Sequence, residues 1–278
     1  THYINKRWEN IYLNPQDIPS VLPLLSFAMS TALELFQDLL KPHQTLVIPH
    51  ELLGYEKNEF WFNSASKGES TGIHNHNEYA IVSENRVTAI PENSDLKTAP
   101  LYGCAITTAF GILQNEAHIR SGESMVIFGV GGVGSALIVA SKLISVYPIV
   151  AIDINDSKLG KAMKFGATHI INSEKDDVSA KIKKMFPNGV DVVVETTGLN
   201  SVKELAFELT APQGKTVFVG VTKAGEKVSI DSTPLHFGKS LVTSYGGSAN
   251  PSNDIPRLIQ LQQIGRINLD GMITQEYP

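Results

Sequence analysis

The segment that most constrains what this chain can fold into is residues 124–153, SMVIFGVGGVGSALIVASKLISVYPIVAID. An apolar strand pattern at Met125–Phe128 runs into a glycine-rich turn, which leads into a helix pattern and then into a second apolar strand. That second strand ends on an acid, Asp153. A dinucleotide-binding βαβ unit requires strand, turn, helix, strand and terminal acid in this order. The segment therefore predicts a nucleotide site at the turn.

Four glycines give this turn its predicted chemistry. Gly129 permits the tight turn after the strand, and Gly131 lets the backbone come close to a pyrophosphate. Gly134 lets the helix and the strand pack without a Cβ between them, and Gly132 is the fourth glycine of the turn. We expect the phosphates to lie on the helix N-terminus, where unpaired N–H groups and the helix dipole favour negative charge.

Asp153 is predicted to select the nucleotide. It follows Gly134 by about 20 residues, the spacing at which an acidic residue reaches the adenosine ribose of a bound dinucleotide. A carboxylate there accepts hydrogen bonds from the ribose hydroxyls and repels a 2′-phosphate. The sequence therefore favours NAD over NADP as the cofactor.

Composition and charge argue against several other classes of protein. The 278 residues suffice for two domains, and 42% hydrophobic with 18% charged residues is typical of a soluble globular protein. A net charge of −5 disfavours a nucleic-acid partner, and the glycines inside the longest apolar region, Met125–Ser141, disfavour a membrane span. The single cysteine, Cys104, excludes an internal disulfide framework and favours a reducing, cytoplasmic compartment. We expect no signal peptide at the start of the chain.

Two sequence patterns divide the chain. Residues 1–105 predict a small β-rich domain, with strands at Ile11–Leu13, Thr45–Ile48, Phe60–Phe62 and Tyr79–Val82 and one helix at Ser26–Leu40. Residues 106–250 alternate helices and strands, and residues 251–278 begin with a further helix, Pro251–Ile264. Within 106–250, besides the glycine-turn unit, we expect elements at Thr107–Gln114, Ser157–Phe165 (ended by Gly166), His169–Asn172, Val178–Met185, Val190–Glu195, Leu199–Leu209, Thr216–Val221 and Ser240–Tyr245. The predicted fold class is α/β, a doubly wound parallel Rossmann sheet with a second, smaller β-rich domain.

Seven motifs in order resemble the medium-chain dehydrogenase family, which includes zinc alcohol, sorbitol and threonine dehydrogenases. They are HNEYAIVSENRVTAIP (76–91), GCAITTAFG (103–111), GVGGVG (129–134), AIDIN (151–155), KFGATHIIN (164–172), DVVVETTG (191–198) and GRINLDGMITQEYP (265–278). The resemblance implies an NAD-binding Rossmann domain carried on a GroES-like catalytic domain, with the active site in the cleft between them. It also implies that residues 251–278 return toward the catalytic domain.

The same resemblance assigns cofactor contacts. Val133 matches the residue that packs behind the nicotinamide ring, and Thr108 matches a threonine that lies against this ring. Asp153 matches the ribose-binding acid, and Lys158 matches a lysine that contacts the same ribose. Three further positions match strand ends that line the cofactor groove: Thr197, Val219 and Val221.

A catalytic zinc site is implied less completely. Family members hold zinc with cysteine, histidine or glutamate ligands and leave one position open for substrate. Cys104 matches one ligand cysteine, and His50 with Glu51 resembles the family's GHExxG motif. Thr31 matches the hydroxyl that begins the family's proton relay. Met29 stands at the other cysteine position, and a thioether is a poor zinc ligand beside a thiolate.

Two interpretations of the metal stay open: a degenerate zinc site and no catalytic zinc. His74 and His76 form an HxH pair with metal-binding spacing, but a polar loop explains this pair more simply. The sequence also predicts a trimmed first domain, since a short stretch separates His50 from Glu78. The chain ends at Pro278, where relatives continue, so it is either unusually short or incomplete.

The leading functional hypothesis is an NAD-dependent alcohol dehydrogenase that converts a polyol-like or amino-alcohol substrate to a carbonyl. One alternative is a metal-free enzyme that resembles the family's quinone and enoyl reductases, although these usually prefer NADPH. The other is a catalytically weakened protein that binds NAD. We expect a small-molecule substrate, no nucleic-acid or membrane partner, and a homo-oligomer like the relatives.

Overall fold

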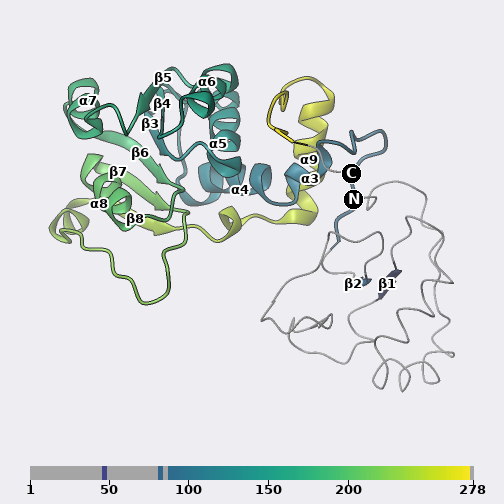
Figure 1. Ribbon diagram of the computed structural model, residues 1–278. Coiled ribbons are helices and arrows are strands. Elements are labelled where there is room, and N and C mark those ends of the chain that lie inside the picture. Colours follow the sequence, from purple (N-terminus) through teal and green to yellow (C-terminus); the bar gives the residue numbers. More distant parts are fainter. Residues whose placement is uncertain (1–45, 49–80, 84–86, 276–278) are drawn as a thin grey trace. The chain divides into compact units, whose positions relative to one another are not determined.

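A computed structural model of the chain describes residues 46–48, 81–83 and 87–275 (Figure 1). The chain divides into two compact units, Thr1–Leu96 and Lys97–Pro278. In the first unit, strands β1 (Leu46–Ile48) and β2 (Ile81–Ser83) pair in parallel. Both lie where the sequence predicts strands. The other strands and the helix predicted for residues 1–78 lie outside the described residues.

The second unit is built on one six-stranded sheet with the strand order β5-β4-β3-β6-β7-β8, and every neighbouring pair is parallel. The strands are β3 (Met125–Phe128), β4 (Ile149–Asp153), β5 (His169–Asn172), β6 (Val190–Glu195), β7 (Thr210–Phe218) and β8 (Ser240–Thr243). Chain order reverses between β3 and β6, as in the doubly wound dinucleotide-binding fold. The predicted α/β class is confirmed, while its GroES-like part falls mostly on residues outside those described.

Helices connect the strands and cover both faces of the sheet (Figure 1). In chain order the helical elements are α3 (Ala99–Tyr102), α4 (Ala105–Gly111), η3 (Ile112–Glu116), α5 (Gly132–Leu143), α6 (Asp156–Phe165), α7 (Val178–Met185), α8 (Asn200–Leu209), η4 (Thr233–Phe237), η5 (Gly246–Ser248) and α9 (Pro251–Gln263). None of the helices in the described part of the chain has the length and apolarity needed to cross a membrane.

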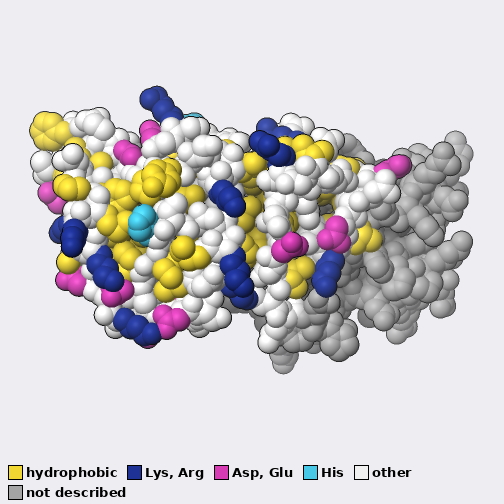
Figure 2. Space-filling model, turned by 90° about the horizontal axis from the view of Figure 1, so that it is seen from above, with side chains coloured by type: hydrophobic (Ala, Val, Ile, Leu, Met, Phe, Trp, Pro, Cys, Tyr) yellow, Lys and Arg dark blue, Asp and Glu magenta, His cyan; other side chains and the backbone are white. Residues whose placement is uncertain are grey.

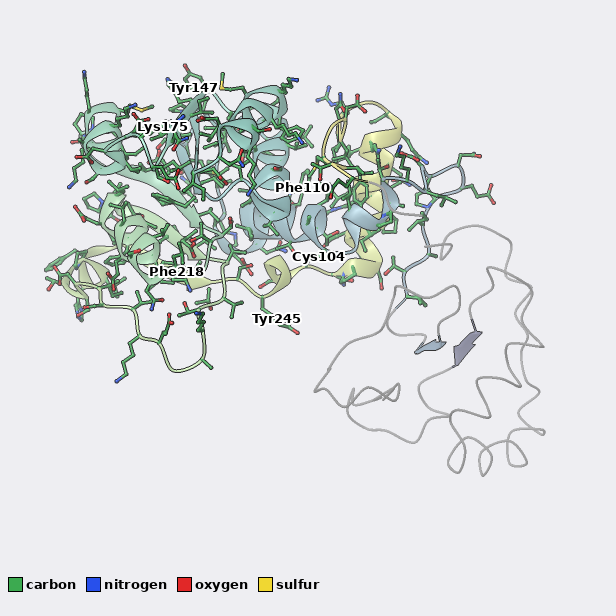
Figure 3. All side chains as sticks on the ribbon, viewed as in Figure 1. Cys104, Phe110, Tyr147, Lys175, Phe218 and Tyr245 are labelled. Carbon is green, nitrogen blue, oxygen red and sulfur yellow. The ribbon has the colours of Figure 1, made fainter. Side chains whose placement is uncertain are left out.

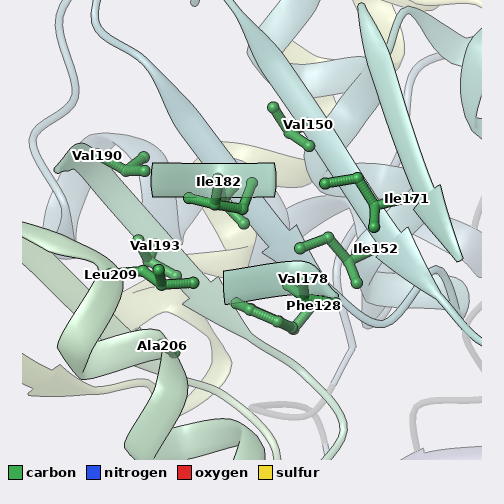
Figure 4. Close-up of a cluster of buried hydrophobic side chains, with 11 residues drawn as sticks. Phe128, Val150, Ile152, Ile171, Val178, Ile182, Val190, Val193, Ala206 and Leu209 are labelled. Atoms are coloured by element: carbon green, nitrogen blue, oxygen red, sulfur yellow. The ribbon is translucent and has the colours of Figure 1, made fainter. Parts of the chain in front are cut away.

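A hydrophobic cluster joins α7 and α8 to one face of the sheet (Figure 4). Strands β3 and β4 each contribute two alternate residues, because alternate side chains of a strand point to the same face. Helix α5 packs on the opposite face, where Ser141 contacts Met125 and Gly134 approaches Ile127. The buried cluster comprises Val126, Phe128, Val150, Ile152, Ile171, Val178, Ile182, Val190, Val193, Ala206 and Leu209. This two-sided core fixes the strand ends that carry the predicted site.

Local sequence signals place several elements at their observed limits. Strands β3, β5 and β6 and helix α7 begin and end as predicted. Helix α6 begins one residue earlier than predicted, where Asn155 caps it by accepting hydrogen bonds from Ser157 N and Lys158 N, and Gly166 ends it with φ +122°. Polar capping residues and a left-handed terminal glycine are the standard signals for such boundaries.

Three elements predicted in the second unit have clearly different limits in the structure. Strand β7 spans Thr210–Phe218 rather than 216–221, because the Pro212–Gly214 stretch, which suggests a turn, joins the strand beside an irregular register with β6. The helix predicted at 107–114 is α4, which begins at Ala105 and continues as the π-helix η3. Strand β8 ends at Thr243, before Tyr245, because two glycines and a 3-10 turn follow.

The described surface carries charges of both signs. On the face in Figure 2, Lys and Arg side chains alternate with Asp and Glu side chains rather than gathering by sign. Exposed ion pairs of this kind include Lys175 with Asp156 and Lys183 with Glu208. Such pairs contribute little to stability because water screens them.

Candidate functional site

The carboxyl ends of β3 and β6 form the point where chain order reverses. In open α/β sheets, ligands bind outside the strand ends at this point, because the connecting loops diverge to opposite faces and leave a crevice. The loops after β3, β4, β6 and β7 therefore build the candidate site. All of the predicted cofactor positions except Thr108 lie on these loops, on the helices that follow them or, for Asp153, at the end of β4.

The glycine turn after β3 is tight on its inner side and open on its outer side. Gly129 has φ +90°, and a Cβ there would lie 2.5 Å from Thr196 Oγ1. A Cβ on Gly134 would overlap the Gly129 carbonyl oxygen, whereas one on Gly131 meets no atom within 4 Å. Gly129 and Gly134 thus allow the chain to fold tightly, while Gly131 leaves its outer side open. Gly132 begins α5, whose N-terminus no side chain caps.

Asp153 ends β4 and turns toward the glycine turn. Its Oδ2 accepts a hydrogen bond from Val130 N at 2.8 Å, and its Oδ1 accepts one from Asn155 N at 2.9 Å. Lys158 Nζ lies 3.8 Å from Oδ2, and the Asp153 side chain is 6% exposed. Because an ionised carboxylate offers about four lone pairs, each oxygen retains one acceptor position. Asp153 therefore fixes the turn and keeps capacity for a ribose hydroxyl.

The loop after β6 supports the glycine turn from the other side. Thr196 Oγ1 donates to the carbonyl oxygens of Phe128 and Gly129, at 2.8 and 3.1 Å. Thr197 donates its N–H and its hydroxyl to Oε1 of Glu195, which also accepts from Gly198 N at 2.8 Å. Thr197 itself is exposed. Hydrogen bonds from Thr196 and to Glu195 therefore fix this loop, and Thr197 is exposed to solvent on it.

The loop after β7 packs directly on the loop after β6. A Cβ on Gly220 would overlap Gly198 N, and one on Gly198 would lie 2.6 Å from the Val221 carbonyl oxygen. Val219 is half-buried, whereas the Val221 side chain is 92% exposed. The structure thus brings Thr197, Val219 and Val221 to adjoining loops at one edge of the sheet.

Helix α4 brings two further predicted residues into the second unit. Cys104 is exposed at the N-cap of α4 (Figure 3), and Thr108 is buried one turn later. The Ala105 side chain lies 4.0 Å from the position of a Cβ on Gly132, so α4 begins beside the glycine turn. Val133, in the first turn of α5, is half-buried.

Of the residues predicted for the metal site, the structure describes only Cys104. Met29, Thr31, His50 and Glu51 lie outside the described residues, as do His74 and His76. Within residues 46–48, 81–83 and 87–275, no three His, Cys, Asp or Glu side chains gather closely enough to hold a metal ion. Cys104 therefore stands as one candidate ligand whose predicted partners belong to the other part of the chain.

Sequence reasoning missed several residues that shape the site. Glu195 and Thr196 belong to the ETTG motif, and their contacts depend on β6 lying beside β3. Ile154 and Leu199 follow β4 and β6, and their side chains are 59% and 60% exposed. An apolar residue directly after a strand-ending acid was a signal for Ile154. No local signal marks Glu195 as fully buried.

Known proteins match both the sequence and the fold. A family described as zinc-binding dehydrogenase matches residues 132–263. The alcohol dehydrogenase class-2 isozyme 2 of Oryctolagus cuniculus is 28% identical over 240 residues, which cover 85% of this chain and 63% of that protein. The S-(hydroxymethyl)glutathione dehydrogenase of Saccharomyces cerevisiae is 30% identical over 223 residues, which cover 77% of this chain and 58% of that protein.

Solved structures give the same result. An alcohol dehydrogenase zinc-binding domain protein from Burkholderia ambifaria has a TM-score of 0.64 at 34% identity, covering 67% of this chain and 51% of that chain. Benzyl alcohol dehydrogenase from Acinetobacter calcoaceticus has a TM-score of 0.64 at 31% identity, covering 67% and 52%. The chain spans about half to just under two thirds of the length of these relatives.

Proposed function

Because this chain belongs to the medium-chain dehydrogenase/reductase family, we propose that it is an NAD-dependent oxidoreductase that transfers a hydride between an alcohol and nicotinamide, with a carbonyl as the oxidised product. One observation carries the proposal: an open glycine turn, an uncapped α5 N-terminus and Asp153 meet at the reversal point of the sheet. The bound nicotinamide supplies the hydride chemistry, and the chain supplies binding and orientation.

The geometry supports a specific cofactor pose. The pyrophosphate would lie at Gly131 and Gly132, where no side chain caps α5 and the helix dipole favours an anion. The adenosine ribose donates to Asp153, with Lys158 beside it. A 2′-phosphate would meet the Asp153 charge, so NAD is preferred to NADP. Ile154 offers an exposed apolar surface for the adenine ring.

We place the nicotinamide end of the cofactor between α4 and the strand-end loops. Val133 lies one residue after Gly132 in α5, and Thr108 lies in α4, which begins beside Gly132. Thr197, Val219 and Val221 supply the opposite wall through the adjoining loops after β6 and β7. These assignments are proposals that extend the family's positions to this chain.

Zinc is a separate proposal. His50 and Cys104 would hold the ion, Glu51 would act near it, and Thr31 would begin the proton relay. A bound zinc ion would lower the pKa of a coordinated alcohol and so favour hydride loss. Met29 at the remaining ligand position favours a second candidate function, an NAD-binding protein with weakened catalysis. A polyol-like or amino-alcohol substrate, a homo-oligomeric state and a cytoplasmic location are further predictions of the first candidate.

A paired titration and assay test the proposed function. Purified protein is titrated with NADH and with NADPH, its zinc content is measured without prior chelation, and a panel of polyols, amino alcohols and aromatic alcohols is assayed with NAD. We expect NADH to bind at least about tenfold more tightly than NADPH, since charge repulsion of this kind contributes more than 1 kcal/mol.

The outcomes separate the candidates. Turnover with zinc present supports the alcohol dehydrogenase. Tight NADH binding without turnover on any alcohol supports the weakened NAD-binding protein. A clear preference for NADPH, with reduction of a quinone or an enoyl compound, would instead favour the metal-free reductase.

A further inference from the structure

Lys203 is a buried cation on α8. Its side chain is 5% exposed, and its Nζ lies 5.4 Å from the centre of the Phe218 ring. The ammonium donates a hydrogen bond to the hydroxyl of Thr222. No ion pair joins it to a carboxylate within the described part of the chain. Because burying an ammonium is costly, a buried lysine with a neutral partner calls for a physical explanation.

A second buried ionisable side chain, Glu195, lies on the same face of the sheet. Glu195 pairs in register with Phe218 across β6 and β7, so both side chains emerge on the face that α8 covers. Glu195 is fully buried, and its Oε2 has no hydrogen-bond partner among the described residues. Lys203 and Glu195 therefore lie on the same face of the sheet, under α8.

These two side chains hold two adjoining loops through hydrogen bonds. Oε1 of Glu195 fixes the loop after β6 through Thr197 and Gly198, and Lys203 fixes the loop after β7 through Thr222. Gly198 and Gly220 then pack backbone against backbone. On its inner side the loop after β6 contacts the glycine turn through Thr196. A continuous path of contacts leads from Thr222 to the candidate cofactor groove.

We infer that Lys203 is a positioning residue for the cofactor: its ammonium anchors Thr222 and so sets where the loop after β7 meets the nicotinamide. This inference rests on the proposed NAD-binding function. Val221, adjacent to Thr222, is almost fully exposed, so its side chain adds little packing to hold this part of the loop in position. Loss of the anchor leaves the sheet intact and lets the loop move away from its bound position, which lowers affinity because ordering must then accompany binding.

The full-length chain offers a matched control. Lys239 is also a buried lysine, 8% exposed, with its Nζ 4.7 Å from the centre of the Phe207 ring and hydrogen-bonded to the Phe207 carbonyl at 2.8 Å. It directly precedes β8, so it lies at the amino end of the sheet, away from the strand-end loops. Lys203→Met and Lys239→Met therefore make the same chemical change in similar surroundings at opposite ends of the strands.

The test measures NADH affinity by fluorescence titration, with thermal unfolding of each cofactor-free variant as the readout of folding. We expect Lys203→Met and Thr222→Val each to weaken NADH binding roughly tenfold, the value of one charge-assisted hydrogen bond. The double variant should bind NADH no less tightly than the single variant of lower affinity, because both changes remove the same interaction. Thr222→Ser keeps the hydroxyl and should retain wild-type affinity, and Lys239→Met should bind NADH as the wild type does.

Three results would overturn the inference while leaving the proposed function intact: wild-type affinity in Thr222→Val, fully additive losses in the double variant, or equal weakening in Lys239→Met. The Thr222 variants decide the matter even if Lys203→Met does not fold. If the wild-type chain binds neither NADH nor NADPH, the proposed function fails first, and the inference that rests on it fails with it.

Discussion

Asp153 holds the fold together at the position where we propose that the ribose of the nucleotide binds. Two backbone N–H groups, from Val130 and Asn155, already donate to its oxygens, so the carboxylate is in place before a nucleotide arrives. A pre-positioned acceptor binds its ligand with little loss of conformational entropy. The cost is that the same residue contributes to stability, and a substitution there changes two properties at once.

Asp153→Asn is predicted to weaken NADH binding roughly tenfold and to reduce the preference for NADH over NADPH, since the neutral amide neither repels a 2′-phosphate nor makes charge-assisted bonds. Parallel titrations with both nucleotides measure this. Asp191→Asn is the control. Its carboxylate accepts from Ser124 N and Oγ, at 2.8 and 2.6 Å, at the amino end of β6. Asp191→Asn should lower stability without changing cofactor preference, and an equal loss of preference in both variants would refute the assignment.

At the scale of elements, Tyr102 links α3 to α9. Its ring is fully buried, and its hydroxyl donates to Gln262 Oε1 at 2.9 Å. Burial raises the pKa of this phenol well above its ordinary value. A tyrosine whose pKa is raised in the folded state adds stability below the unfolded pKa, about 10, and that stability is lost as the pH rises further, because the unfolded chain releases the proton first.

Tyr102→Phe should therefore lower the free energy of unfolding by about 1 kcal/mol near neutral pH, through loss of a buried hydrogen bond. It should also flatten the decline in stability above about pH 10. Urea denaturation at a series of alkaline pH values measures both effects. Tyr147→Phe, at a side chain that is 64% exposed, is the comparison and should leave the alkaline decline unchanged. The same alkaline slope in Tyr102→Phe and the wild type would contradict the prediction.

Helix α6 contains two glycines with opposite roles. A Cβ on Gly160 meets no atom within 4 Å, whereas Gly166 ends the helix at φ +122° with the Lys142 side chain against it. Gly160→Ala should stabilise the protein by about 0.5–1 kcal/mol, since alanine loses less backbone entropy in a helix. Gly166→Ala should destabilise it by a similar amount or more. Urea midpoints of the two variants give the comparison, and a destabilised Gly160→Ala would count against the geometry of α6.

Local sequence signals account for the elements that were predicted correctly. The apolar runs of β3 and β6 and the capping residues of α6 determine those elements with little help from distant residues. The predicted limits of β7 were wrong because its pairing with β6, rather than its own sequence, sets them. Strand β7 begins beside the start of β6, and the chain leaves the sheet where Gly220 contacts Gly198. The π-helix η3 has no comparable sequence signature and was not predicted.

At the scale of the whole molecule, the arrangement of the candidate site could be predicted from the sequence only where its residues are close along the chain. The glycine turn and Asp153 belong to one βαβ unit, so their spacing alone brings them together. The supports of that turn, Glu195 and Thr196, are far away in sequence and reach it only because β6 inserts beside β3. The predicted boundary between domains, after residue 105, differs from the division of the compact units after Leu96. Residues 97–105, between these two boundaries, include α3, which interacts with α9.

Cofactor binding and alcohol turnover should separate when the chain is divided between Leu96 and Lys97. Residues 97–278 contain the sheet and every predicted cofactor position, whereas Thr31, His50 and Glu51 belong to the other unit. We expect circular dichroism to show that residues 97–278 fold, because this unit has a hydrophobic core of its own. Its dissociation constant for NADH should lie within about tenfold of that of the full chain. The unit should oxidise no alcohol. Turnover by this fragment would refute the proposed roles of the first unit.

The segment between β7 and η4 suggests where this protein could accept foreign sequence. The base of the segment is held to α8, through Asn200 to Lys227 and Glu204 to Ser229, but its tip at Gly225 has open space around it. In Figure 1 the segment extends as a long loop away from the sheet. Exposed tips with tied bases tolerate inserted domains and labels. A fluorescent reporter placed after Ala224 would lie on the same loop as Thr222, making this position a natural attachment point for a nucleotide sensor.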